Sequence, residues 1–129
     1  MVETTHHTVD FYKYLASLFY AVAAVDHNVV IAEKRKIKEL VDENWSFKSG
    51  DIDSQEVIFS TLKKLITDNY DKEVAFLDFK NFFLKHPEEF PTHIRTKILD
   101  DADSITVAYA RRNKSESVLI SRLYFLLRE

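Results

Sequence analysis

Apolar residues recur at helical spacing over residues 8–25, where steps of four and three residues alternate between Phe11, Leu15, Leu18, Val22 and Val25. This spacing places their side chains on one face of an α-helix. Over residues 32–45 the apolar stripe is narrower, and charged residues fill the remaining positions. We therefore predict two helices, of which the second lies on the surface with one stripe facing inward.

The helical pattern is interrupted over residues 46–53, around the glycine at position 50. Asp53 and Glu56 have the spacing of a capping box, in which the first side chain covers free backbone amides and the second reaches back. This motif predicts the start of a third helix. The polar run at residues 68–71 predicts its end.

Three more helices follow in the second half of the chain. Residues 71–85 have the widest apolar arc, which suggests a central position in the bundle. Pro87 and Pro91 end this helix, because proline supplies no amide hydrogen and restricts the residue before it. A fifth helix is predicted over residues 92–109, and a sixth begins at Ser115, the expected N-cap.

Glycine and proline usage narrows the fold class. The chain has 129 residues with one glycine and two prolines, whereas β-sandwiches and α/β folds of this length need many more turn residues. Glycine-rich phosphate loops are excluded for the same reason. We predict an all-α fold: one domain over residues 1–129, a compact bundle of about six helices, with residues 1–7 as a flexible N-terminus.

The net charge and the absence of cysteine exclude several kinds of ligand and chemistry. The net charge of −3 disfavours nucleic acid, because no basic field attracts a phosphate backbone. The absence of cysteine excludes disulfides, thiolate nucleophiles and sulfur-ligated zinc, and it fits a cytoplasmic protein. No apolar run has the length needed to span a bilayer, so we predict no membrane insertion.

The two ends of the chain show a weak internal similarity. The first helix, its turn and the second helix correspond to the fifth helix, the turn at residues 111–113 and the sixth helix. In both places a helix end rich in small residues or tyrosine precedes a polar turn and then a glutamate, Glu33 or Glu116. The pattern is compatible with two pseudo-symmetric halves.

The stretch Tyr20-Ala-Val-Ala-Ala-Val-Asp-His-Asn-Val-Val-Ile-Ala-Glu33 resembles the signature of the TerB-like family. This family comprises the tellurite-resistance TerB proteins and a related segment of a DnaJ-type co-chaperone. Its pattern is an alanine-rich helix end, then Asp-Gly, a hydrophobic residue and a glutamate seven positions after the Asp. Asp26, Val29 and Glu33 occupy these places.

The sequence departs from the family pattern at three positions. His27 stands in place of the glycine, and in the second copy Arg111 and Val118 stand where acidic residues are expected. The resemblance implies an all-helical fold and a non-enzymatic role in metal binding or stress response, such as tellurite resistance. If the acidic clusters of the family bind cations, Arg111 and Val118 imply that the C-terminal cluster is lost in this chain.

The turn after the first helix is the candidate metal site. Asp26 and Glu33, with the amide oxygen of Asn28, supply the oxygen ligands that Ca²⁺ or Mg²⁺ requires. Asp100 and Asp103 share a helix face and could complete this site if the fold brings them near. In the structural alternative, Asp26 and Glu33 satisfy turn and helix-end amides, and the aspartates form a solvated face.

No catalytic motif accompanies these carboxylates, so we predict that the protein is not an enzyme. None of His27, His86 and His93 has a second histidine at helical ligand spacing, and no His-Glu-x-x-His motif or histidine–carboxylate pair is identifiable from the spacing. The competing function is a metal-independent protein interaction module that uses an apolar surface near Phe90 or Trp45. The identity of the protein partner and the oligomeric state stay open.

Overall fold

The computed structural model describes residues 8–25, 28–46, 48–49, 52–108 and 113–128. Residues 1–7, predicted to be flexible, lie outside the described residues. The described elements are α1 (Val9–Ala23), α2 (Ile31–Asn44), β1 (Lys48–Ser49), β2 (Ile52–Asp53), α3 (Ser54–Thr67), α4 (Lys72–Lys85), a 3₁₀ helix η1 (Pro87–Glu89), α5 (Thr92–Thr106) and α6 (Lys114–Leu127). The predicted all-α bundle of six helices is confirmed.

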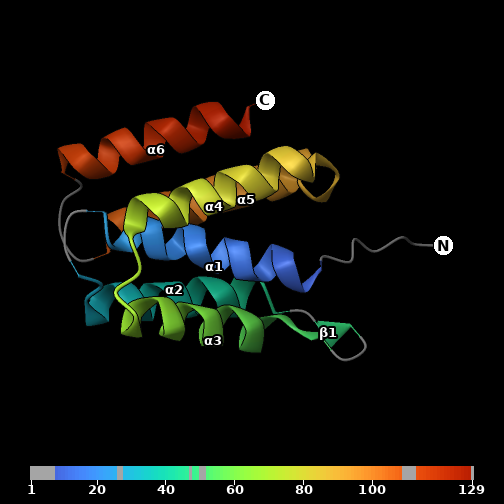
Figure 1. The fold of residues 1–129 in the computed structure, drawn as a ribbon, viewed down its shortest axis with the longest axis horizontal. Coiled ribbons are helices and arrows are strands. Elements are labelled where there is room, and N and C mark those ends of the chain that lie inside the picture. The colour runs from blue at the N-terminus through green and yellow to red at the C-terminus, as the bar shows by residue number, and fades with distance from the viewer. Residues whose placement is uncertain (1–7, 26–27, 47, 50–51, 109–112, 129) are drawn as a thin grey trace.

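Helix α1 is the centre of the bundle (Figure 1). Every residue from Leu15 to Ala23 is buried, and α1 packs against α3, α4, α5 and α6. The central position predicted for α4 is wrong. Its arc is wide because it includes Leu77 and Leu84, and both side chains are exposed.

A short hairpin occupies the predicted interruption between α2 and α3. Strands β1 and β2 are antiparallel, with Lys48 opposite Asp53 and Ser49 opposite Ile52. Gly50 lies outside the described residues. The Asp53 side chain accepts a hydrogen bond from the Glu56 amide at 3.4 Å, which confirms Asp53 as the N-cap of α3.

The turn between α3 and α4 follows from its sequence. Asn69 adopts a left-handed conformation (φ 49°), which asparagine tolerates better than most residues. Its amide donates to the Ile66 carbonyl, and the Tyr70 amide donates to the Leu65 carbonyl, which is the Schellman arrangement at a helix end. Asp71 then caps α4 by accepting from the Val74 amide at 3.0 Å.

The start of α6 differs from the prediction. The N-cap is Asn113, not Ser115. The Asn113 side chain accepts from the Glu116 amide at 2.9 Å, and the Glu116 carboxylate accepts from the Asn113 amide at 3.0 Å. Asn113 is the N-cap because Glu116 follows it by three residues, and the two side chains together complete the reciprocal capping box.

Phe90 and Trp45 belong to the hydrophobic core. Their relative exposures are 1% and 0%, so neither side chain can be an exposed contact of the apolar surface predicted near them. The Phe90 ring lies 4.9 Å from Phe83 and 5.2 Å from Phe11, and the Phe11 ring lies 6.0 Å from Trp45, between ring centres. The loop after α4 thus closes this end of the bundle.

None of the described helices combines the length and the apolar character that a membrane crossing requires.

Candidate functional site

The turn between α1 and α2 holds the predicted metal ligands. Asp26 and His27 lie outside the described residues, and Asn28 is exposed. Glu33 lies in the first turn of α2, and its relative exposure is 1%. Of the predicted ligand set, the structure therefore describes Asn28 and Glu33, and it buries Glu33.

Glu33 has a structural role at the start of α2. The N-cap residue, Val30, has no side-chain acceptor, and its own backbone amide donates to Glu33 Oε1 at 3.0 Å. Glu116 does the same for α6, and it is also buried. The two glutamates of the internal similarity therefore cap the starts of α2 and α6 in the same way. This shared role favours the interpretation in which Glu33 satisfies a helix-end amide over the one in which it binds a metal ion.

Replacement of Glu33 by alanine is expected to lower the free energy of unfolding by about 1–2 kcal/mol, because the Val30 amide loses its acceptor. Urea unfolding followed by circular dichroism measures this change. Glu33→Gln keeps an acceptor oxygen and should retain most of the stability. Glu39→Ala, an exposed change on the same helix, should stay within about 0.5 kcal/mol. Equal losses for the alanine and glutamine variants would contradict the capping role.

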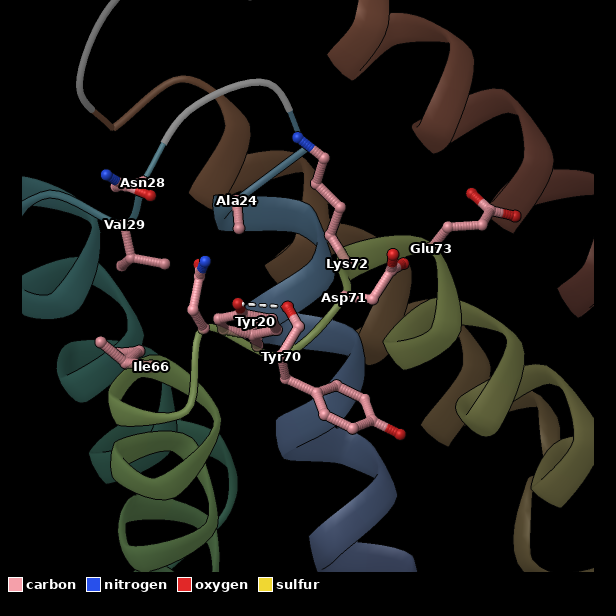
Figure 2. Close-up of a pocket in the computed structure, with 10 residues that line it drawn as sticks. Tyr20, Ala24, Asn28, Val29, Ile66, Tyr70, Asp71, Lys72 and Glu73 are labelled. Atoms are coloured by element: carbon pink, nitrogen blue, oxygen red, sulfur yellow. Dashed lines mark hydrogen bonds between the residues drawn. The ribbon is translucent and has the colours of Figure 1, made fainter.

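A cleft of about 1080 Å³ lies beside the turn (Figure 2). Asn28 and Val29 line one side, and Asp71 and Lys72 from the start of α4 line the other. The Tyr20 hydroxyl donates to the Tyr70 carbonyl at 2.6 Å and so ties α1 to the α3–α4 turn. The cleft therefore joins two turns that are far apart in the sequence.

The acidic groups of this cleft already have structural partners. Asp71 caps α4, and Glu73 extends away toward α6, where Arg122 Nη1 and Nη2 donate to its two oxygens at 2.9 and 2.7 Å. The Tyr70 hydroxyl donates to Asp78 at 2.6 Å, and this bond, with burial, raises the pKa of Tyr70 to about 12.

Asp100 and Asp103 flank a buried carboxylate on α5. Asp101 accepts from Trp45 Nε1 at 2.7 Å and from Asn44 Nδ2 at 2.9 Å, so this part of α5 lies at the C-terminal end of α2. Glu33 lies in the first turn of α2, about 16 Å along the helix axis from Asn44, because each residue of an α-helix adds about 1.5 Å. The structure therefore does not place Asp100 and Asp103 beside Glu33.

A groove between α4 and α6 is the strongest candidate for binding. One part, of about 520 Å³, is lined by Phe76, Lys80, Leu84, Arg122, Phe125 and Leu126. A second part, of about 360 Å³, meets it at Arg122 and is lined among others by Lys72, Glu73, Lys114 and Val118. We call these residues together the α4–α6 groove.

Exposed apolar side chains mark the α4–α6 groove. Phe125 is 60% exposed and Leu84 52% exposed, while Phe76 and Leu126, which line the same hollow, are buried. The Arg122 guanidinium lies 4.4 Å from the centre of the Phe76 ring, where it covers the floor of the groove. Large exposed apolar groups that gather around a hollow are typical of an interaction surface.

From the sequence alone, the apolar arcs of α4 and α6 could face either the core or a second subunit. Phe125 precedes Leu126 and Leu127, so its helix appears apolar on several sides and its exposed position is hidden. Val118 and Phe125 are seven residues apart, which places them on one face, but that spacing also fits a core stripe. Only the packing of α6 shows which apolar face is covered.

Comparison with protein-family models, with curated proteins and with solved structures finds no match to this chain. The resemblance to the TerB-like family stays a prediction.

Proposed function

We propose that this protein is a non-enzymatic interaction module that binds an acidic amphipathic helix in the α4–α6 groove. The observation that carries the proposal is the exposure of Phe125 and Leu84 at a hollow whose lining also carries the basic side chains Lys80 and Arg122. This function belongs to the metal-independent class, and its surface lies on α4 and α6, away from Phe90 and Trp45.

The charge around the groove supports an acidic partner. The chain has a net charge of −3, yet the lining carries Lys72, Lys80, Lys114 and Arg122. Among the described lining residues the acidic side chain is Glu73, and Arg122 already pairs with it. The local positive charge therefore attracts acidic side chains on the edges of a partner helix.

The shape of the groove supports a helical partner. Its walls are two helices, and the apolar pair Val118 and Phe125 on α6 is separated by about 10 Å, two turns of a helix. An amphipathic helix presents apolar side chains at the same interval, at positions i and i+7. This is the helix-in-groove mode of peptide recognition.

The test is a selection followed by affinity measurement. A display library of helix-forming peptides of varied charge is selected on the full chain, and the enriched peptides are synthesised. We expect peptides with apolar residues at helical spacing and flanking Asp or Glu. Phe125→Asp should weaken their binding at least about tenfold, as measured by fluorescence anisotropy, because it removes a central anchor and adds a repulsive charge. Added salt should also weaken binding.

Val107→Asp is the matched control. Val107 is 51% exposed, follows α5 and does not line the groove, so this variant should bind like the unmodified chain. Enriched peptides without acidic residues, or with equal affinity for Phe125→Asp, would overturn the proposal, as would a selection without enrichment. Self-association lost on Phe125→Asp in sedimentation equilibrium would show that a second copy occupies the groove instead.

The cation site at the α1–α2 turn stays a prediction. Asp26, its central ligand, lies outside the described residues, and Glu33 caps α2. The stress-response role, including tellurite resistance, is implied by the family resemblance and also stays a prediction.

A further inference from the structure

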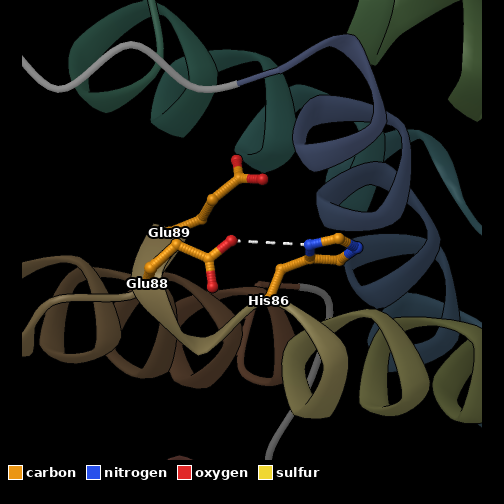
Figure 3. A group of neighbouring side chains, drawn as sticks. All are labelled: His86, Glu88 and Glu89. Carbon is orange, nitrogen blue, oxygen red and sulfur yellow. Dashed lines mark ion pairs between the residues drawn. The ribbon is translucent and has the colours of Figure 1, made fainter.

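We propose that His86, Glu88 and Glu89 form a binding site for a divalent transition metal such as Zn²⁺ (Figure 3). These residues follow α4 and span η1, at the opposite end of the bundle from the α1–α2 turn (Figure 1). One ligand atom from each lies within 4.8 Å of the others. The site is distinct from the predicted oxygen-ligand site at Asp26 and from the α4–α6 groove.

The spacing of the donor atoms suits a metal ion. His86 Nδ1 and Glu88 Oε2 are 3.5 Å apart. In a tetrahedral zinc site with bonds of about 2.1 Å, neighbouring ligand atoms lie about 3.4 Å from each other. The first pair therefore already has the required separation, and a carboxylate oxygen of Glu89 lies within 4.8 Å of a ligand atom of each of the other two residues.

The backbone holds the three ligands on a short rigid segment. The His86 amide donates to the Phe82 carbonyl, and the Glu89 amide donates to the His86 carbonyl, at 2.9 and 3.0 Å. Phe90, immediately after the site, is anchored in the core, and Arg95 Nε donates to its carbonyl at 2.6 Å. Prolines at positions 87 and 91 reduce the backbone freedom that metal binding would otherwise have to restrict.

Side-chain contacts orient two of the ligands. The His86 ring packs on Phe82 with ring centres 4.7 Å apart. The Thr8 amide donates to Glu89 Oε1 at 3.3 Å, and the Thr8 hydroxyl lies 3.4 Å from both Glu89 oxygens, so the residue before α1 positions this carboxylate. Hydrogen bonds of this kind to ligating carboxylates are a common feature of metal sites.

The ligand types indicate which metal binds. One imidazole nitrogen with two carboxylates suits Zn²⁺ and neighbouring transition metals, whereas Ca²⁺ and Mg²⁺ prefer oxygen ligands alone. Two carboxylates held close together repel each other, and a divalent cation neutralises both. Three protein ligands leave a coordination position for water or for a group on a binding partner.

The test is isothermal titration calorimetry of the full chain with Zn²⁺, Ca²⁺ and Mg²⁺ in parallel. We expect one Zn²⁺ per chain and weaker binding of the other two ions. Glu88→Gln, at an exposed position where the fold is not at risk, and His86→Ala should each weaken Zn²⁺ binding at least roughly tenfold. The d–d absorption of bound Co²⁺ should decrease in the same variants.

Three control variants separate this site from other donors. His93→Ala removes an exposed histidine outside the group, Asp26→Asn tests the α1–α2 turn, and a double change of His6 and His7 to alanine tests the N-terminal pair. All three should bind Zn²⁺ like the unmodified chain. The proposal is overturned if Zn²⁺ does not bind, if Glu88→Gln and His86→Ala bind it normally, or if binding is lost in a control variant instead.

Discussion

Replacement of Phe90 by alanine is expected to lower the free energy of unfolding by about 3–5 kcal/mol. The side chain is 1% exposed, and its ring contacts those of Phe11, Phe79 and Phe83. Its removal leaves a cavity among aromatic rings that belong to helices and cannot close around it. Because small proteins have a total stability of only about 5–15 kcal/mol, this is a large fraction of the whole.

Urea unfolding, followed by circular dichroism and by Trp45 fluorescence, measures the loss. Phe125→Ala is the matched control, because it makes the same chemical change at a side chain that is 60% exposed. It should change the stability by no more than about 0.5 kcal/mol. Similar losses for the two variants would mean that Phe90 is not a core residue or that α6 packs differently. The pair also separates the residues that stabilise the fold from those that bind.

Replacement of Asp101 by alanine is expected to cost about 1–3 kcal/mol, because the Trp45 indole and the Asn44 amide lose their common acceptor inside the protein. Trp45 Nε1 donates to Asp101 Oδ2 at 2.7 Å, and Asp101 itself is buried. Thermal and urea unfolding measure the loss. Asp101→Asn keeps one acceptor oxygen and should lose less. A neutral effect of the alanine variant would show that the two donors find other partners.

The same carboxylate makes stability depend on pH. Burial raises the pKa of Asp101 above its ordinary value of 3.8, against the lowering effect of the hydrogen bonds from Trp45 and Asn44. The folded state therefore holds this proton more tightly than the unfolded state. Its contribution is fully present below pH 3.8 and is lost as the pH rises through the folded pKa. Asp101→Asn should remove this component, which urea unfolding over a series of pH values would detect.

Glu73 contributes in the opposite direction. Its hydrogen bonds with Arg122 hold the pKa of the Glu73 carboxyl below its ordinary value. This contribution is present above the ordinary pKa of 4.5 and is lost as the pH falls through the folded pKa. The Glu73 pair is exposed, so its effect on stability is small. Its greater importance is in placing Arg122 over the floor of the α4–α6 groove.

The two proposed binding sites use different surfaces. The groove is formed by α4 and α6, with Phe125 and Leu84 as its exposed apolar groups, whereas the metal ligands lie on the loop after α4. A variant of Glu88 should leave peptide binding unchanged, and a variant of Phe125 should leave Zn²⁺ binding unchanged. The failure of one proposal would therefore not affect the other.

Local sequence determined the helices and several of their ends. The apolar spacing in α1, the capping residue Asp53 and the prolines after α4 act on neighbouring residues, so their effect does not depend on the rest of the fold. The prediction of Ser115 as the N-cap of α6 is wrong because two residues able to cap lie close together, and Asn113 is the one that does so. The choice of Asn113 depends on a reciprocal bond with Glu116, which the spacing of that pair already contained.

The tertiary structure alone decided which apolar residues are covered. Phe90 and Phe125 carry the same side chain, yet Phe90 closes the core and Phe125 faces solvent, because a side chain is buried only where the rest of the fold packs against it. The same holds for charge: Glu33 and Asp101 are buried among partners, while His86, Glu88 and Glu89 converge at the surface. By itself the sequence determined that the chain is a bundle of helices, since helical periodicity is local. Exposure and convergence depend on how the helices pack, and they decide where this protein can bind.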